Sequence, residues 1–103
     1  MMIVGLGVSR IYSPPLMDFS GNRKTGATVK VEVVGPDGKW WDGSNWVSSY
    51  AQATAGELGS GVYYIDVNFS QTGLYGVFWV DPDVSGAGYY ERFLCVEALN
   101  IIG

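Results

Sequence analysis

The sequence predicts an all-β fold, an antiparallel β-sandwich of about seven strands with no disulfide. Fifteen of its 103 residues are aromatic and fifteen are glycine, a composition that favours strands and tight turns. Runs of strand-forming residues alternate with turn signals about every 8–12 residues, and no amphipathic helical run of useful length is present. The single cysteine, Cys95, has no partner for an internal disulfide.

The length is that of one domain, which we expect to span residues 1–103. We assign an N-terminal strand and loop to residues 1–26, the sandwich body to residues 27–97, and an apolar tail to residues 98–103. Charged residues make up 16% of the chain, against about 25% in an average domain. The surface is therefore expected to be poor in charge, or partly covered by something else.

The N-terminal part predicts two strands separated by a polar loop. Residues 3–12 predict the first strand, although its glycines weaken it, and residues 18–26 predict the loop. Residues 27–34 predict the clearest strand, because valines alternate with polar residues at a period of two. One face of this strand should be buried, with inward-pointing side chains at Val29, Val31 and Val33.

The middle of the chain predicts a hairpin rich in tryptophan. Two turn signals, each with an Asp-Gly step, flank a short strand at residues 39–41, and a return strand follows at residues 46–50. We expect Trp40 to point into the core and Trp41 to lie on the opposite face. Residues 51–60 are small and polar, and predict a loop or a weak edge strand.

Residues 61–67 and 73–80 each begin with a Gly-x-Tyr step and continue through strand-forming residues. We expect two adjacent antiparallel strands joined by a short polar link. A loop rich in Gly and Asp then leads to a last strand at residues 89–97. The side chains expected to point inward from the Gly-x-Tyr strands are Tyr63, Ile65, Val67, Tyr75, Val77 and Trp79.

Residues 71–77, Gln-Thr-Gly-Leu-Tyr-Gly-Val, resemble the tyrosine corner of immunoglobulin-like domains, in which a tyrosine hydroxyl bonds to nearby backbone at the start of a late strand. Val77 stands where such domains can carry a disulfide cysteine, so the resemblance is to a disulfide-free immunoglobulin-like sandwich. Residues 26–97 also resemble such domains in tailed-phage virion proteins, where Gly-Ala/Thr-Val, Asp-Gly, Gly-x-Tyr and a closing Glu-x-Phe recur.

The resemblance implies a virion structural protein of a tailed phage, in the first place a capsid decoration (cement) subunit that stabilises the shell through protein–protein contacts. A tail or head–tail connector component is the alternative within this class. The implied partners are the major capsid protein or tail subunits, and other copies of the chain in a homo-oligomer, with a trimer as the first guess. The N-terminus lacks the pattern of a signal peptide, so we expect synthesis in the host cytoplasm and a place in the virion.

The low charge and the apolar chain ends favour an assembly subunit, because such ends would be a liability on an isolated domain. Apolar ends can add to a neighbour's sheet edge or fill its groove, and tryptophan is enriched at interface centres. The candidate partner-contact residues are therefore Trp41, Trp46, Ile3, Leu6, Leu99, Ile101 and Ile102.

A carbohydrate-binding module is the alternative from a different class. Trp41, Trp46 and Tyr50 lie close together in the sequence, and exposed aromatic rings could stack on sugar rings. Packing in the core is the first expectation for these tryptophans, an interface the second and sugar the third. Coplanar rings open to solvent would favour sugar binding, whereas rings covered by a protein partner would favour assembly.

Asp81, Asp83 and Ser85 supply oxygens at alternate positions and Gly86 follows, as at the start of a calcium-binding loop. Arg92 stands where such a loop carries its glutamate. An ordinary turn, which also uses Asp, Pro and Gly, is therefore the preferred interpretation. We predict no metal ion and no other cofactor.

The remaining composition argues against catalysis and against two kinds of partner. The chain has no histidine, the commonest general base and metal ligand, and Cys95 lies in an apolar stretch where cysteine acts as a small hydrophobic residue. We therefore expect no enzyme. A net charge of −4 argues against a nucleic-acid partner, and no segment approaches the roughly 20 apolar residues of a membrane span.

Overall fold

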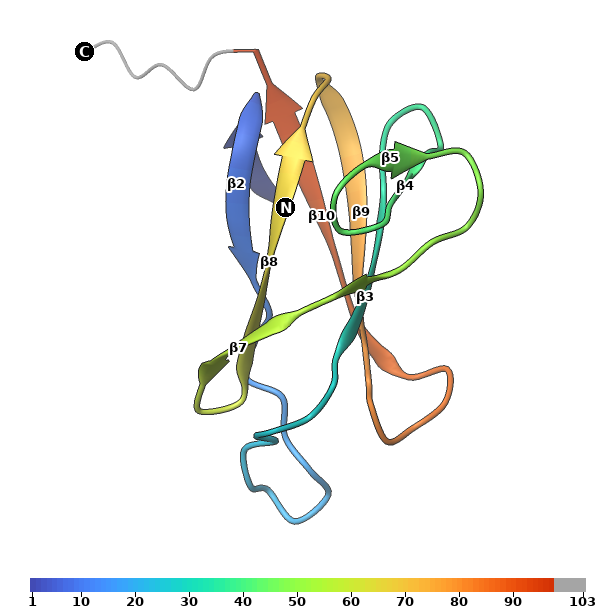
Figure 1. Ribbon diagram of the computed structural model, residues 1–103. Helices are drawn as coiled ribbons and strands as arrows, with labels where there is room; N and C mark the ends of the chain where they lie inside the picture. The colour runs from blue at the N-terminus through green and yellow to red at the C-terminus, as the bar shows by residue number, and fades with distance from the viewer. Residues whose placement is uncertain (98–103) are drawn as a thin grey trace, which may run out of the picture.

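The computed structural model describes residues 1–97 as a β-sandwich of two sheets (Figure 1). The prediction of an all-β fold without a disulfide is thus confirmed. The described residues contain no helix long and apolar enough to cross a membrane. The strands are β1 (Met2–Gly5), β2 (Gly7–Tyr12), β3 (Lys30–Val34), β4 (Trp40–Trp41), β5 (Trp46–Val47), β6 (Ala53–Thr54), β7 (Gly56–Gly59), β8 (Val62–Phe69), β9 (Gly73–Val80) and β10 (Gly88–Val96).

The larger sheet has the strand order β1-β10-β9-β3-β4-β5. β6 also pairs with β3, on the edge opposite to β9. The smaller sheet has the order β2-β8-β7. All pairings are antiparallel except that of β1 with β10, which is parallel. The terminal strands are β1 and β5 in the larger sheet and β2 and β7 in the smaller one, and the edges at β1 and β2 lie on the same side of the sandwich (Figure 1).

The first strand predicted from the sequence, residues 3–12, is in fact two strands in different sheets. β1 pairs with β10 in the larger sheet, and β2 pairs with β8 in the smaller one. The chain reverses between them at Leu6 and Gly7, where Gly7 has φ +114°, a conformation that side chains rarely adopt. Gly7, one of the glycines that weaken a single strand, is thus the residue that allows the chain to change sheets.

The two Gly-x-Tyr strands, β8 and β9, were expected to be adjacent but do not pair. β8 is the central strand of the smaller sheet, whereas β9 lies between β10 and β3 in the larger one. Residues 70–72 therefore cross from one sheet to the other. The predicted inward directions are nevertheless confirmed, because both strands alternate and both direct their buried faces into the same core.

The core between the sheets combines three valines, two of them in β3 and one just before it, with large aromatic side chains. Val29, Val31 and Val33 are fully buried, as the period of two predicted. The rings of Phe69 and Tyr75 meet edge to face with centroids 4.9 Å apart, which joins β8 to β9 across the core. The largest fully buried side chains are Trp79, Tyr63, Tyr75 and Phe69.

Tyr75 closes the connection between the sheets by hydrogen bonds to the backbone. Its hydroxyl donates to the carbonyl oxygen of Gln71 at 2.6 Å and accepts from the Gln71 N–H at 3.2 Å. Burial raises the pKa of Tyr75, so the hydroxyl keeps the proton that it donates. This arrangement has the geometry expected of a tyrosine corner.

Replacing Tyr75 with Phe should destabilise the domain by about 1–2 kcal/mol, because a partly buried hydrogen bond to the Gln71 backbone is lost. For a domain of this size the melting temperature should fall by roughly 5–15 °C. Thermal unfolding followed by circular dichroism would measure this. Tyr12→Phe is the matched control, because Tyr12 is exposed on β2 and should melt like the wild type. Equal melting of the two variants would show that the corner bond adds nothing.

Candidate functional site

The outer face of the larger sheet collects aromatic side chains that point away from the core. In one row across this face, Arg92 lies opposite Gly76, Gly76 opposite Val34, and Val34 opposite Trp40. Directly opposed residues share a face of a sheet, so these four positions face the same way. The neighbouring row on the same face consists of Tyr90, Phe78 and Glu32.

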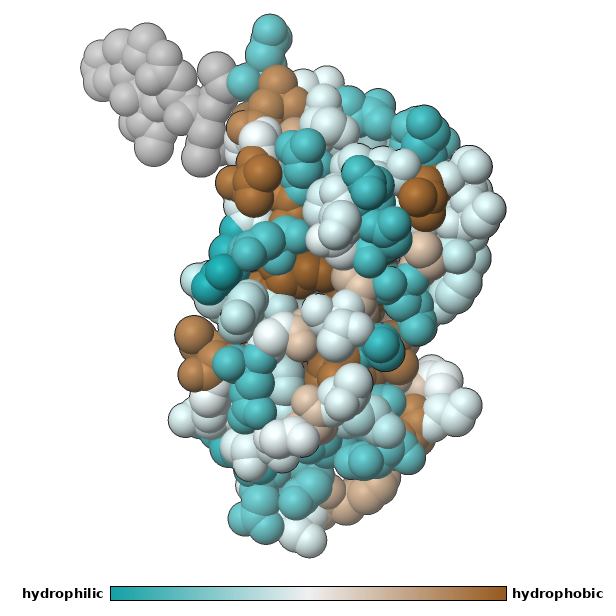
Figure 2. Space-filling view, in the orientation of Figure 1, coloured by the Kyte–Doolittle hydropathy of each residue, from teal (hydrophilic) through white to brown (hydrophobic). Residues whose placement is uncertain are grey.

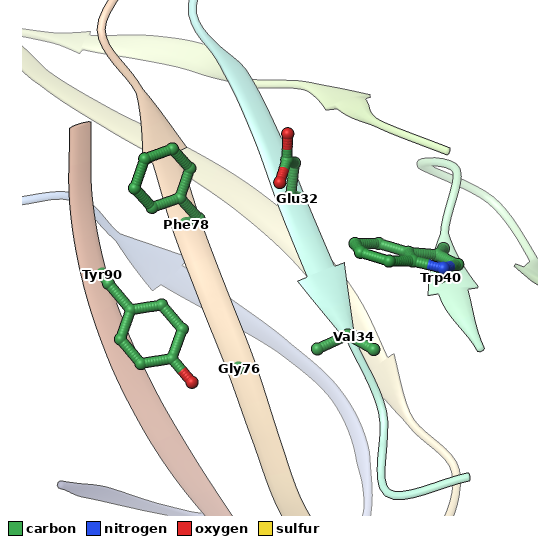
Figure 3. Close-up of a pocket in the computed structure, with 6 residues that line it drawn as sticks. All are labelled: Glu32, Val34, Trp40, Gly76, Phe78 and Tyr90. Atoms are coloured by element: carbon green, nitrogen blue, oxygen red, sulfur yellow. The ribbon is translucent and has the colours of Figure 1, made fainter. Parts of the chain in front are cut away.

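These rows enclose an open apolar groove of about 350 Å³ (Figure 3). Gly76 forms its floor: a Cβ atom at this position would lie 2.8 Å from the Tyr90 hydroxyl oxygen and 3.3 Å from a methyl carbon of Val34. The absence of a side chain at residue 76 therefore lets the Tyr90 ring and Val34 lie close over this strand, and a larger side chain here would push them into the groove. The lining residues are Glu32, Val34, Trp40, Gly76, Phe78 and Tyr90.

One wall of the groove is held by a small polar network. The Glu32 carboxylate accepts hydrogen bonds from the Tyr50 hydroxyl at 2.5 Å and from the Gln52 amide nitrogen at 3.2 Å. The bond to Glu32 raises the pKa of Tyr50. Tyr50 in turn meets the Trp40 ring edge to face, with centroids 4.9 Å apart. Glu32 thus positions the aromatic wall, and the groove offers apolar surface instead of a nucleophile paired with a base.

The outer face of the smaller sheet is more polar. Arg10 forms an ion pair with Asp66 at 2.8 Å, and its guanidinium lies 4.1 Å from the centroid of the Tyr64 ring. Figure 2 shows the molecule from the side on which β8 lies in front of β10, and apolar residues there are scattered among polar ones. The groove on the larger sheet is therefore the better candidate for a binding surface.

The sequence prediction placed Trp40 and Trp41 on the wrong faces of the sheet. Trp41, and not Trp40, points into the core and is only 5% exposed. Trp40 lies opposite Val34, whose side chain is on the outer face of the sheet, so the next residue of β4 points inward. Trp46 is half-buried against Trp41 and Tyr75. Trp41 therefore presents little surface to a partner protein or a sugar.

Both indoles hold the hairpin to the opposite sheet. The Trp41 indole N–H donates to the backbone oxygen of Asp66 at 3.1 Å, and that of Trp46 donates to the backbone oxygen of Asn68 at 2.8 Å. The two rings are tilted by 55°, so they are not the coplanar, solvent-facing platform that sugar binding would favour. In this structure they bridge β4 and β5 to β8.

The remaining candidate contact residues are placed as follows. Ile3 is 56% exposed and lies opposite Leu94, which lies opposite Leu74, so it adds an apolar row beside the groove. Leu6 is exposed in the turn between β1 and β2. Three further candidates lie outside the described residues: Leu99, Ile101 and Ile102.

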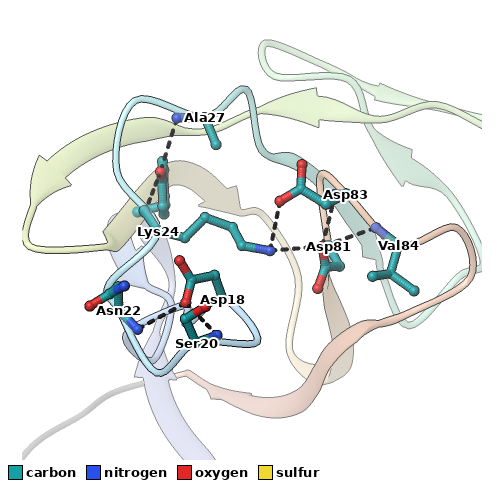
Figure 4. A network of polar contacts seen from close by, with 9 residues as sticks. Asp18, Ser20, Asn22, Lys24, Ala27, Asp81, Asp83 and Val84 are labelled. Carbon is teal, nitrogen blue, oxygen red and sulfur yellow. Dashed lines mark hydrogen bonds and ion pairs between the residues drawn. The ribbon is translucent and has the colours of Figure 1, made fainter.

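The carboxylates considered for calcium face a lysine. The Lys24 ammonium lies 3.2 Å from an Asp81 oxygen and 2.9 Å from an Asp83 oxygen (Figure 4). Asp81 also accepts hydrogen bonds from the backbone N–H groups of Asp83 and Val84, as the carboxylate of a tight turn does. Ser85 is exposed on the same loop. Within residues 1–97, no three metal-ligating side chains of the His, Cys, Asp and Glu types are grouped.

Sequence reasoning missed the groove because it followed the inward-facing residues and the tryptophans. Gly76 and Phe78 are the outward positions of a strand whose inward residues were assigned correctly, and Tyr90 is an outward position of β10. Cys95 is buried, and this burial raises the pKa of its thiol, which disfavours the reactive thiolate. The signal that could have revealed the groove was the presence of aromatic residues, Phe78 and Tyr90, at outward positions of two strands.

The melting temperature should depend on pH through Asp81. The hydrogen bond from the Asp83 N–H, together with Lys24, lowers the pKa of Asp81. Its carboxylate therefore stabilises the fold above its unfolded pKa of about 3.9, and this contribution is lost as the pH falls through the folded pKa. Asp81→Asn should melt below the wild type at pH 7, and the difference should shrink toward pH 2. A constant difference over this range would contradict the assignment.

Calcium should not stabilise the protein, because Lys24 already occupies the position between the two carboxylates. Melting curves with millimolar calcium and with chelator should coincide for the wild type. Lys24→Met removes the competing cation and serves as the sensitive comparison. A calcium-dependent rise in the melting temperature of the wild type would show that the ion displaces the lysine.

Comparison of the chain with protein family models, with curated proteins and with solved structures gives no match.

Proposed function

We propose that this protein is a non-enzymatic structural subunit that binds other proteins through the outer face of its larger sheet. The groove is the observation that carries this proposal. It is open and apolar, its aromatic side chains come from several strands of one sheet, and Gly76 adds no side chain at its floor. Buried aromatic anchors in pockets dominate the binding energy of protein interfaces, and strands hold such anchors in fixed positions.

In its specific form, we propose a virion subunit of a tailed phage, a capsid decoration protein that bridges neighbouring shell subunits. A tail or head–tail connector component is the alternative. The distribution of strands supports an immunoglobulin-like domain: β2, β7 and β8 share one sheet and β3, β9 and β10 the other, as strands B, D, E and C, F, G do in that fold. The hydrogen bond from Tyr75 to Gln71 supports the same assignment.

The apolar surface beside the groove supports assembly instead of a small-molecule site. Ile3, Leu94 and Leu74 extend the apolar face toward the free edge at β1. Trp40 and Tyr50 meet at 65°, which favours packing against a protein over stacking on a sugar ring. A binding surface of this kind would be covered when the subunit joins its partner.

The proposal predicts that the chain co-sediments with virions purified from the infected host, and that the groove is needed for this. Tyr90→Ala should reduce incorporation at least tenfold, because loss of an aromatic anchor costs about 2 kcal/mol or more at an interface centre. Tyr12→Ala is the matched control, an equally exposed tyrosine on the smaller sheet. Quantitative immunoblotting of gradient fractions would measure both. A wild-type chain found only in the soluble fraction would sink the proposal.

A further inference from the structure

One aromatic side chain outside the groove is almost fully exposed. Phe19 lies at the tip of the loop between β2 and β3 and is 97% exposed. It is the second residue of a tight turn, in which the Gly21 N–H donates to the Asp18 carbonyl oxygen at 3.1 Å. A large apolar side chain in this position stands clear of its own protein.

The turn that presents Phe19 is well ordered by hydrogen bonds. One oxygen of the Asp18 carboxylate accepts from the N–H groups of Ser20 and Asn22, both at 2.9 Å (Figure 4). The Asp18 N–H donates to the Asn22 carbonyl oxygen at 2.8 Å, and Met17 is bridged to Arg23. These hydrogen bonds would reduce the conformational entropy that the turn loses on binding.

The base of this loop is fixed to the body of the domain. The Tyr63 hydroxyl donates to the Lys24 carbonyl oxygen at 2.8 Å, and the Leu16 N–H donates to the Gly61 carbonyl oxygen at 2.9 Å. In Figure 1 the loop projects past the end of the sandwich opposite to the end that carries β4 and β5. Phe19 lies beside Asp81 and Asp83, neither of which lines the groove of its own chain.

We propose that Phe19 of one copy fills the aromatic groove of a second copy, so that the chains associate head to tail. The groove's apolar lining and its volume of about 350 Å³ suit a phenyl ring, and Tyr90, Phe78 and Trp40 offer edge-to-face partners. The charges also match: Asp18 precedes Phe19, and Arg92 lies beside Gly76 with no ion pair among the described residues. This inference rests on the proposed function, because it uses the same groove.

A contact between two different surfaces of one chain is heterologous. Such contacts generate a ring if the rotation closes, and an open filament if it does not. One phenyl anchor and a short turn bury less area than a standard interface, so the isolated protein should associate weakly. Copies held side by side on a larger assembly would associate more strongly, because their effective concentration is high.

Two variants test this arrangement through complementation. Phe19→Ser lacks the anchor but keeps an open groove, whereas Gly76→Val fills the groove but keeps the anchor. Sedimentation velocity up to about 1 mM should show concentration-dependent association of the wild type, since so small an interface is weak. Each variant alone should associate at least tenfold more weakly. An equimolar mixture should recover one-to-one dimers, because the Gly76→Val anchor can enter the Phe19→Ser groove.

Leu58→Ser is the matched control for the loss of an exposed apolar side chain, and it should associate like the wild type. Thermal melting of every variant confirms that the groove is tested in a folded domain. Association of Phe19→Ser that equals that of the wild type would overturn the proposal, and so would a mixture that stays monomeric. A wild type that is monomeric throughout the concentration range would overturn it as well.

Two results would distinguish failure of the head-to-tail contact from failure of the proposed function. If Phe19→Ser enters virions normally and the wild type does not self-associate, the groove serves a different protein and only the head-to-tail inference fails. If the wild type self-associates through Phe19 but never co-sediments with virions, the inference stands and the virion proposal fails.

Discussion

The packing of aromatic side chains between the two sheets is the interaction on which the rest of this structure depends. No disulfide joins the sheets in the described part of the chain, so burial of large rings must hold them together. Two of these rings also order the connections, because the Tyr75 hydroxyl holds residues 70–72 and the Tyr63 hydroxyl holds the loop that carries Phe19. A loss of core packing would therefore disturb the crossings between the sheets as well as the sheets themselves.

This core leaves the outer face of the larger sheet available for binding. Side chains alternate along each strand, so the positions between buried residues point outward, and on β9 and β10 these positions include Phe78 and Tyr90. A rigid sheet holds them in place, while Gly76 provides the space between them. The groove and the Phe19 turn are thus two fixed features on one rigid body, and their separation makes an intermolecular contact the natural way to combine them.

Local pattern predicted the strands of the body and their buried faces well, because a period of two depends only on neighbouring residues. It was wrong where the answer depends on which sheet a strand joins. Residues 3–12 divide between both sheets, and β8 and β9 do not pair although they are consecutive. Trp40 and Trp41 were reversed because, in a strand of two residues, alternation has too few positions to set the inward side, and pairing with β3 sets it.

The sequence by itself determined the all-β class, the absence of a disulfide and the inward-facing residues of the long strands. These follow from composition and from alternation along a single strand. Only the tertiary structure decided the strand order, the burial of Trp41 and the groove around Gly76, because each of these needs the register between strands that are distant in the sequence. The placement of Phe19 likewise needed the fold, since its exposure depends on where the loop leaves the core.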